Sequence, residues 1–461
     1  MKLLKNRKPF DLCSSNLGTR FCICKIIWAL VGLILIFHVH SIIIYKSNTN
    51  SKVSVSVTIG DKELKVVEEE PMFMLPPRRK HSPHAVKRIG GRVKKHQHQH
   101  PTVIDEFLDE SSKLRPFFFP DRRPPNDTLY YYPGERWVDT DGNLIQAHGG
   151  GVLVVENTYY WYGENKDGRT YHAHSKSLAR VDIIGVNCYS SNDLRTWKNE
   201  GVVLPAEKTN QTHDLYTLNV LERPKVIFND ETSQYVMWMH IDNANYTKAS
   251  IGVAVSEKPT GPFKYLYSKR PNGFDSRDMT IFKDDNGLGY LIYSSDGNND
   301  LRITLLTNDY LDVTTVMRKT LVGRRREAPA VFKHQNTYYM ITSGCSGWAP
   351  NRAMAHAADS MLGPWETLGN PCVGGNLMFR MTTFFSQGTF VVPLPGVSDS
   401  FVFMADRWNP ADLKDSRYVW LPLTVGGLPD APLEYDFAFP LWSRITIYWH
   451  KKWKLPNQTQ L

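Results

Sequence analysis

Arg326-Glu327-Ala328-Pro329-Ala330-Val331-Phe332 places a carboxylate at the head of a short apolar run, and this stretch decides the fold because its layout recurs. In each copy a polar residue leads a β-type run, and after a turn a second strand rich in aromatic residues follows. The five leading residues are His148, Glu222, Asp278, Glu327 and Gln387, at intervals of 49 to 74 residues. These intervals are somewhat above the roughly 40–50 residues of common propeller repeats, which leaves room for four strands and a long loop in each blade.

The turns between paired strands fit hairpins. The clearest is Asp284-Asp285-Asn286-Gly287, because Asn-Gly readily supplies the positive φ angles of a tight turn. We interpret Asp284 and Asp285 as turn residues and not as metal ligands. A β-sandwich of similar strand count would not explain why every repeat begins with a polar residue. The sequence therefore predicts an all-β, five-bladed β-propeller over residues 130–449, followed by a C-terminal tail at 450–461.

The propeller geometry predicts a site. The first strand of each blade is innermost, so Glu222, Asp278, Glu327 and Gln387 should converge around one end of the axis. Crowded carboxyl groups raise at least one pKa, and a carboxyl that keeps its proton can protonate a departing sugar oxygen. An isolated Glu beside an Arg is more simply a structural ion pair, but the fivefold repetition favours catalysis for Glu327 and Asp278.

The N-terminal region predicts a membrane anchor. Residues 1–100 carry 18 Lys and Arg against 6 Asp and Glu, a net +12 that leaves −3 for residues 101–461. The folded part is therefore not basic, which argues against nucleic acid as the main partner. Residues 26–45 are apolar over about a bilayer's thickness and follow a basic flank, so we expect a cytoplasmic tail (1–25), an uncleaved transmembrane signal anchor (26–45) and a disordered lumenal stem (46–129).

Modification sites and cysteines fit a lumenal domain. Asn-x-Ser/Thr acceptors occur at Asn126, Asn210, Asn245 and Asn457, all on the predicted lumenal side. Three cysteines lie beyond the anchor, Cys188, Cys345 and Cys372, and three permit at most one bridge. We favour a disulfide between Cys345 and Cys372, while three free thiols remain the alternative.

These residues resemble a known family, glycoside hydrolase family 43, and within it the exo-β-1,3-galactanases. The resemblance covers roughly residues 130–448. It rests on the repeat heads and on the segments Trp161-Tyr162-Gly163-Glu164, Ser191-Asn192-Asp193-Leu194-Arg195-Thr196-Trp197, Glu222-Arg223-Pro224-Lys225, Gly347-Trp348-Ala349-Pro350-Asn351 and Asp406-Arg407-Trp408.

The resemblance implies residue roles. Glu327 would be the general acid, and Asp278 would tune its pKa. The family's usual base, an Asp after an Ala-His pair, is missing, because Gly149 and Gly150 follow Ala147-His148. The galactanase branch shares this gap, and by its pattern Gln387 and Glu222 would position the water. Substrate contacts would come from Glu164, Tyr246, Trp348, Ser346 and Asp406.

Aromatic residues near the same end, Tyr162, Tyr246 and Trp348, are candidates to stack on sugar rings. Trp161 and Trp238 are better explained as core, since strand alternation points every second side chain between blades. No cofactor is expected, and no ligand set predicts the axial calcium that some members of the family hold.

We therefore expect a single-pass Golgi membrane glycoprotein whose lumenal propeller removes terminal β-1,3-linked galactose, with inversion, from arabinogalactan chains of glycoproteins. Two alternatives remain. A glycan-binding propeller that has lost catalysis would explain the missing base. A Golgi glycosyltransferase would share the anchor and stem, and Asp139-Thr140-Asp141 matches the short metal motif of such enzymes, although it precedes an all-β domain.

Overall fold

The computed structural model describes the backbone of residues 41–45, 54–59 and 62–66, residue 119, and residues 129–171, 180–394, 400–426 and 445–455 of the 461-residue chain. The chain divides into two compact units, Met1–Arg115 and Pro116–Leu461.

The first unit contains a three-stranded antiparallel sheet in the order β1-β2-β3, with β1 at Ser41–Tyr45, β2 at Ser54–Ile59 and β3 at Lys62–Val66. The sequence predicted a membrane helix reaching residue 45 and a stem without structure beyond it, so these strands are a difference from that expectation. The rest of the predicted tail and anchor lies outside the described residues. No helix in the described part of the chain is long and apolar enough to span a membrane.

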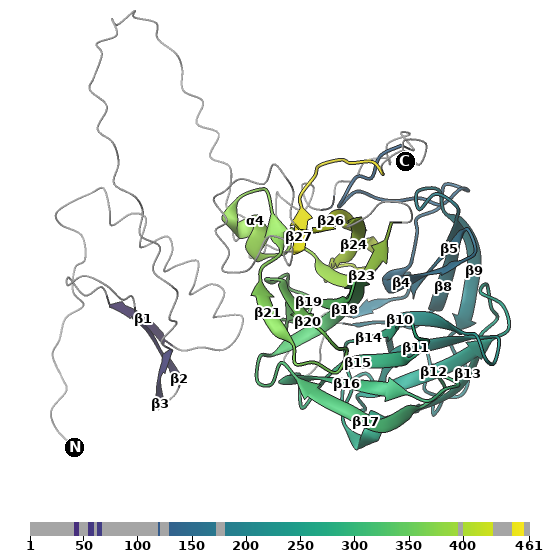
Figure 1. The fold of residues 1–461 in the computed structure, drawn as a ribbon, viewed down its shortest axis with the longest axis horizontal. Coiled ribbons are helices and arrows are strands. Elements are labelled where there is room, and N and C mark those ends of the chain that lie inside the picture. Colours follow the sequence, from purple (N-terminus) through teal and green to yellow (C-terminus); the bar gives the residue numbers. More distant parts are fainter. Residues whose placement is uncertain are drawn as a thin grey trace, which may run out of the picture. The chain divides into compact units, whose positions relative to one another are not determined.

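The second unit is built from five sheets arranged around a common axis (Figure 1). Four of them are four-stranded antiparallel meanders with their strands in sequence order. In the first, a separate two-stranded sheet of β6 (Thr170–Tyr171) and β7 (Arg180–Val181) is inserted between the second and third strands. The first four blades are β4 His148–Val155, β5 Thr158–Glu164, β8 Gly185–Ser191 and β9 Lys198–Pro205; β10 Val220–Asn229, β11 Gln234–Asp242, β12 Ser250–Ser256 and β13 Lys264–Lys269; β14 Met279–Lys283, β15 Gly289–Ser295, β16 Asp300–Leu306 and β17 Val313–Thr320; β18 Arg326–His334, β19 Thr337–Gly344, β20 Met354–Ala358 and β21 Glu366–Gly369.

The fifth blade is more elaborate. Its path is β23-β24-β26-β27-β22, with β25 paired to β24 and with β22 parallel to β27. These strands are β23 Gln387–Pro393, β24 Ser400–Arg407, β25 Arg417–Tyr418, β26 Leu421–Val425, β27 Ile445–Tyr448 and β22 Cys372–Val373, and the short helix α4 Leu377–Met381 follows β22.

The innermost strands close a ring. β4 contacts β10, β10 contacts β14, β14 contacts β18, β18 contacts β23, and β23 returns to β4. The outer strands β13 and β17 lie at the rim (Figure 1). Each inner strand begins within two residues of the polar residue that leads its repeat in the sequence, which we call the head of the blade. The predicted all-β, five-bladed β-propeller is confirmed.

The hydrophobic core is divided among the five interfaces between neighbouring blades. Alternation along a strand explains this division: on β11, Met237 packs toward the first blade, while Trp238 packs toward the third. Trp161 and Trp238 are both fully buried, as predicted for core residues. Tyr162 is also fully buried, on the opposite side of β5 from Trp161, and its hydroxyl donates to the Pro259 carbonyl at 2.6 Å. Its predicted role in sugar stacking is therefore wrong.

The two ends of the propeller meet at a seam. Tyr131 and Trp453 form an antiparallel bridge, with Tyr131 N donating to Trp453 O at 2.7 Å and Trp453 N donating to Tyr131 O at 3.2 Å. Their rings stack with centroids 4.4 Å apart. Residues before the first blade are thus joined to residues after the last.

The predicted disulfide is wrong, since Cys188, Cys345 and Cys372 are all free thiols. Cys345 directly follows β19, the second strand of its blade, and its Sγ donates to Asn298 O at 3.5 Å. Cys372 lies on β22, the outermost strand of the fifth blade. The two residues are close in sequence order, but they occupy opposite radial positions in the propeller.

The short acidic motif of the glycosyltransferase alternative is a turn. Asp139 is 5% exposed, and its Oδ1 accepts hydrogen bonds from the backbone N–H groups of Asp141 and Asn143 at 3.0 and 2.9 Å. Its carboxylate therefore caps a loop ahead of the first blade.

Candidate active site

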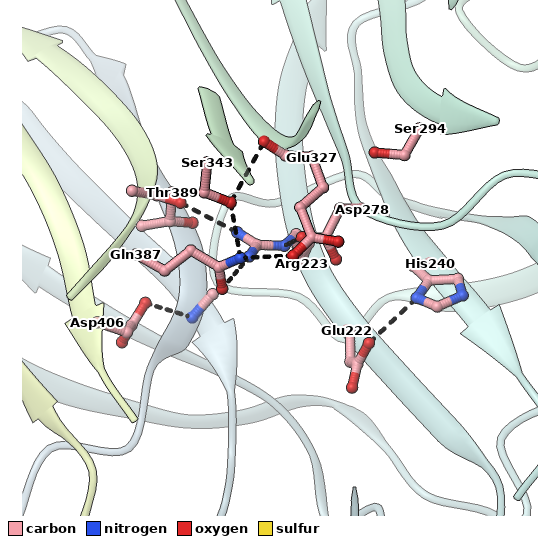
Figure 2. Close-up of polar contacts among 12 residues, drawn as sticks. Glu222, Arg223, His240, Asp278, Ser294, Glu327, Ser343, Gln387, Thr389 and Asp406 are labelled. Atoms are coloured by element: carbon pink, nitrogen blue, oxygen red, sulfur yellow. Dashed lines mark hydrogen bonds and ion pairs between the residues drawn. The ribbon is translucent and has the colours of Figure 1, made fainter. Parts of the chain in front are cut away.

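Three of the five blade heads, His148, Glu222 and Glu327, share a local distortion of the backbone. The pairing of the first and second strands shifts register between His148 and Gly151, between Glu222 and Lys225, and between Glu327 and Ala330. At each bulge the residue after the head has positive φ: Gly149 (59°), Arg223 (55°) and Ala328 (51°). Bulges redirect side chains and are common beside active sites. Here they gather residues of different blades in one place (Figure 2).

Arg223, in the second blade, makes contacts with residues of the first, third and fifth blades. Its Nε lies 2.9 Å from Asp278 Oδ2, its terminal nitrogens donate to Gln387 Oε1 at 2.8 Å and to Gly388 O at 3.2 Å, and its backbone N–H donates to Glu164 Oε1 at 2.9 Å. The side chain is almost fully buried. Arg223 therefore pairs with Asp278 of the next blade, so the structural Glu222–Arg223 ion pair considered from the sequence does not form.

Glu327 is set up as a proton donor. The residue is 7% exposed, and its Oε1 and Oε2 accept hydrogen bonds from Gln387 Nε2 and Asn298 Nδ2, both at 3.3 Å. Burial raises the pKa of Glu327 to about 8; the nearby Asp278 carboxylate adds to this rise and the Arg223 guanidinium opposes it. The group consequently holds its proton at neutral pH.

Glu222 is held in the opposite state. Its Oε1 accepts from the Tyr246 hydroxyl at 2.8 Å, and its Oε2 lies 3.2 Å from His240 Nδ1. Burial disfavours its charge, but the His240 hydrogen bond and the positive charge of Lys166 outweigh burial and lower the pKa of Glu222 to about 2. Glu222 is therefore ionised.

His240 is the cation that keeps Glu222 ionised. Its second nitrogen, Nε2, lies 3.1 Å from Asp242 Oδ2, so the imidazole is held between two carboxylates. Burial opposes protonation, yet hydrogen bonds to Asp242 and Glu222 raise the pKa of His240 to about 9. The site thus contains one carboxyl that keeps its proton and one that does not, which is the pattern of an acid and base pair.

The space of the missing base is not empty. A side chain built on Gly149 would meet the carboxylate of Glu164, which projects from β5. Glu164 is 3% exposed and pairs with Lys166, whose ammonium lies 5.1 Å from the ring centre of Trp348. Burial raises the pKa of Glu164, although Lys166 opposes the rise. The predicted site residue Glu164 therefore stands beside the head of the first blade.

Asp406 and Ser346, both predicted to contact substrate, are engaged within the protein. Asp406 is 2% exposed, and its two oxygens lie 2.9 Å from His148 Nδ1 and 3.0 Å from Gly149 N. The Ser346 hydroxyl donates to Ala349 O at 2.7 Å and accepts from Asn351 Nδ2 at 2.6 Å. These bonds hold the head of the first blade and the loop after β19. Their contact with substrate stays a prediction.

Trp348 is partly exposed and packs edge-on against Trp408, with ring centres 5.0 Å apart. Tyr246 has φ of 55° and reaches Glu222 from the loop after β11. Of the predicted sites, the structure therefore joins Asp278 and Gln387 through Arg223, and Gln387 in turn contacts Glu327. Tyr246 lies at Glu222.

Several functional candidates were missed. His240, Asn298 and Ser343 contact the predicted carboxylates or Gln387, and Trp408 donates to Gln387. His240 and Ser343 lie near the ends of β11 and β19, directly opposite the heads Glu222 and Glu327, so pairing each head with its cross-strand partner would have found both. Trp408 directly follows β24. Asn298 lies in the turn between β15 and β16, where its φ of 63° gives no periodic signal.

Asn210 and Asn245 are exposed, as glycosylation acceptors must be, whereas Asn126 and Asn457 lie outside the described residues. Within the described part of the chain, no group of three or more His, Cys, Asp or Glu side chains could hold a metal ion.

Comparison with known proteins identifies a family model and solved structures that this chain resembles. The model of glycosyl hydrolases family 43 matches residues 150–378. No curated protein matches the chain. A family 43 β-1,3-galactosidase solved with galactodeoxynojirimycin is 38% identical to this chain. The match covers 70% of this chain and 100% of that chain, with a TM-score of 0.62.

Two exo-β-1,3-galactanases are similarly close. The enzyme from Phanerochaete chrysosporium, solved as a variant with β-1,3-galactotriose, is 36% identical, covers 72% of this chain and 70% of its own, and has a TM-score of 0.61. The enzyme from Clostridium thermocellum is 36% identical over 71% of this chain and 66% of its own, with a TM-score of 0.59. Identity at this level over a whole propeller, with an acid and an ionised carboxylate at its axis, means that this chain is a glycoside hydrolase and belongs to glycosyl hydrolase family 43.

Proposed function

We propose that the propeller is an exo-acting β-1,3-galactosidase that hydrolyses terminal β-1,3-linked galactose from arabinogalactan chains of glycoproteins, with inversion at the anomeric carbon. The observation that carries the proposal is the contrast between Glu327, which holds a proton, and Glu222, which does not. Glycoside hydrolysis needs such a pair, one group to protonate the leaving oxygen and one to activate water.

Glu327 is the proton donor in this scheme. Its proton passes to the glycosidic oxygen as the bond to the anomeric carbon breaks. The carboxylate left behind accepts hydrogen bonds from Gln387 and Asn298 and lies close to the positive charge of Arg223, all of which favour its charged form. Asp278 holds Arg223 in place through the 2.9 Å ion pair.

Glu222 is the group that accepts the proton of the attacking water. It is 13% exposed on its side chain, so water can reach it, and His240 and Tyr246 fix both of its oxygens. Inversion requires the water to attack from the face opposite the leaving group, directly and without a covalent intermediate.

The substrate class is supported by the relatives, which are named as β-1,3-galactosidases and exo-β-1,3-galactanases and were solved with galactodeoxynojirimycin or β-1,3-galactotriose. The chain keeps the carboxylates and the Gln387 side chain in one cluster, as the proposal needs.

The test is incubation of the full chain with β-1,3-galactan, followed by proton NMR of the released sugar. Hydrolysis with inversion gives α-galactose as the first product, before mutarotation. The Glu327→Gln variant should keep the fold and lose galactose release by several orders of magnitude. Binding without release would identify a glycan-binding propeller, and activity only with a sugar donor would identify a transferase. Either result would overturn the proposal.

We also propose a type II Golgi membrane protein with this domain in the lumen. The apolar segment at 26–45, its basic flank and the exposed acceptors Asn210 and Asn245 support this topology. Protease protection of the propeller in sealed Golgi vesicles, with a mobility shift on removing N-glycans, is the expected result. A propeller digested without detergent would contradict it.

A further inference from the structure

The amide of Gln387 has an orientation that its neighbours determine without ambiguity. Its Oε1 accepts two hydrogen bonds, from an Arg223 terminal nitrogen at 2.8 Å and from Trp408 Nε1 at 2.8 Å. Guanidinium and indole nitrogens can only donate. The end of the amide that faces them must therefore be the oxygen, and Nε2 must face the other way.

The other face of the amide is directed at the acid. Gln387 Nε2 donates to Glu327 Oε1 at 3.3 Å and to the Ser343 hydroxyl at 2.9 Å (Figure 2). An amide nitrogen carries two hydrogens and offers no acceptor site. To take a proton from water on this nitrogen, Gln387 would have to move a hydrogen onto Oε1, where two N–H groups already point. The surroundings of Oε1 oppose that tautomer.

The indole that enforces this orientation is itself fixed. Trp408 is 9% exposed, and its ring packs edge-on against Trp348 and lies 5.4 Å from the Lys166 ammonium. It follows the end of β24, whose Asp406 anchors the head of the first blade. A packed ring of this kind holds its N–H direction without further cost on binding.

We propose that Trp408 is a positioning residue that, together with Arg223, locks the Gln387 amide so that Gln387 acts as a hydrogen-bond donor to Glu327 and not as the base for water. This inference rests on the proposed function for its kinetic consequences. The donor is most useful after Glu327 has released its proton, because a carboxylate accepts hydrogen bonds more strongly than a protonated carboxyl. Proton acceptance from water then falls to Glu222.

The first test is Trp408→Phe, which removes the indole N–H and keeps an aromatic ring. The matched control is Trp365→Phe: Trp365 is also 9% exposed and also donates through Nε1, to Met361 O at 3.1 Å, but it lies in the core between the third and fourth blades. With β-1,3-galactan, kcat should fall about tenfold in Trp408→Phe with little change in KM. The alkaline limb of kcat/KM should move to higher pH, since the Glu327 carboxylate loses a fixed donor. Trp365→Phe should show neither effect. An unchanged limb in Trp408→Phe would overturn the inference.

The second test is Gln387→Glu, which separates donor from base. If Gln387 were the base, a carboxylate in its place should work at least as well. Activity of Gln387→Glu near or above wild type would therefore overturn the inference. If Gln387 acts as a donor, glutamate cannot replace it, because the variant loses the N–H and adds, besides Asp278, another carboxyl near Glu327. The expected result is a loss of kcat of more than about a hundredfold, with thermal unfolding recorded to exclude misfolding.

A third readout does not depend on turnover. In the full chain labelled with 13C at glutamate carboxyls, the Glu327 signal, assigned by its loss in Glu327→Gln, should titrate at higher pH in Trp408→Phe than in wild type or Trp365→Phe. Equal midpoints would overturn the inference. If the wild-type chain releases no galactose, the proposed function fails, and this titration still decides whether Trp408 fixes the donor.

Discussion

The carboxylate of Glu164 occupies the space into which a side chain on Gly149 would project. Gly149 also has a φ of 59°, a backbone conformation that residues other than glycine adopt only with strain. A base cannot be added at this head unless Glu164 moves, and Glu164 is held by Lys166 and by the Arg223 backbone. The absence of the family's usual base is thus part of a packed arrangement.

Gly149→Asp should therefore fail to supply a base and should destabilise the propeller by about 1–3 kcal/mol, measured by denaturant unfolding. Gly201→Asp is the matched control, because Gly201 has φ of 93° and no atom within 4 Å of its added Cβ. A smaller loss is expected there. Equal losses in both variants would show that Glu164 does not restrict the site.

The alkaline limb of kcat/KM should follow Glu327. Because the proton donor has its pKa raised to about 8, activity should fall as the pH rises through about 8. Asp278→Asn removes the negative charge that favours protonation and leaves Arg223 unopposed, so the limb should move to lower pH. Asp285→Asn, on a turn where the carboxylate is 84% exposed, is the control and should leave the limb in place. A limb unmoved in Asp278→Asn would contradict the assignment.

His240 should make stability depend on pH. Its folded pKa of about 9 lies above the ordinary value of 6.5, so the stabilisation is fully present below pH 6.5 and is lost as the pH rises toward 9. The pKa difference corresponds to up to about 3 kcal/mol. Unfolding free energies measured across this window should fall in wild type and change less in His240→Gln. The same slope in both proteins would remove His240 from this role.

The thiols should be insensitive to reductant. Alkylation of the unfolded, unreduced chain should label Cys188, Cys345 and Cys372, as mass spectrometry of the peptides can show, and reductant should leave the melting temperature unchanged. A crosslinked peptide pair containing Cys345 and Cys372 would refute the structure at this point.

The sequence was sufficient for the propeller and for four of its axial residues, because both follow from a repeated local pattern. Glu222 and Glu327 each lead an apolar run, and the innermost strands that carry them close a ring around the axis. The pattern could not predict Arg223 as the residue that joins Asp278 to Gln387. Ordinary alternation separates the directions of adjacent side chains, and only the bulge at Arg223 brings it to the axis beside Glu222.

The repeat pattern also could not predict which side chains from different blades contact each other. Tyr162 and Trp161 are neighbours in an aromatic strand, yet each belongs to a different interface between blades, which depends on register. The pairing of Cys345 with Cys372 failed because the sequence pattern does not give the radial position that separates the two residues.

The bridge between Tyr131 and Trp453 means that the folded ring has no fixed starting point. Since the two ends of the propeller already lie side by side, a short linker could join them, and new termini could be opened in the exposed turn at Asp285–Gly287. Such a circular permutant would keep every blade and every axial contact. The order of the blades along the chain is thus separable from the site they build.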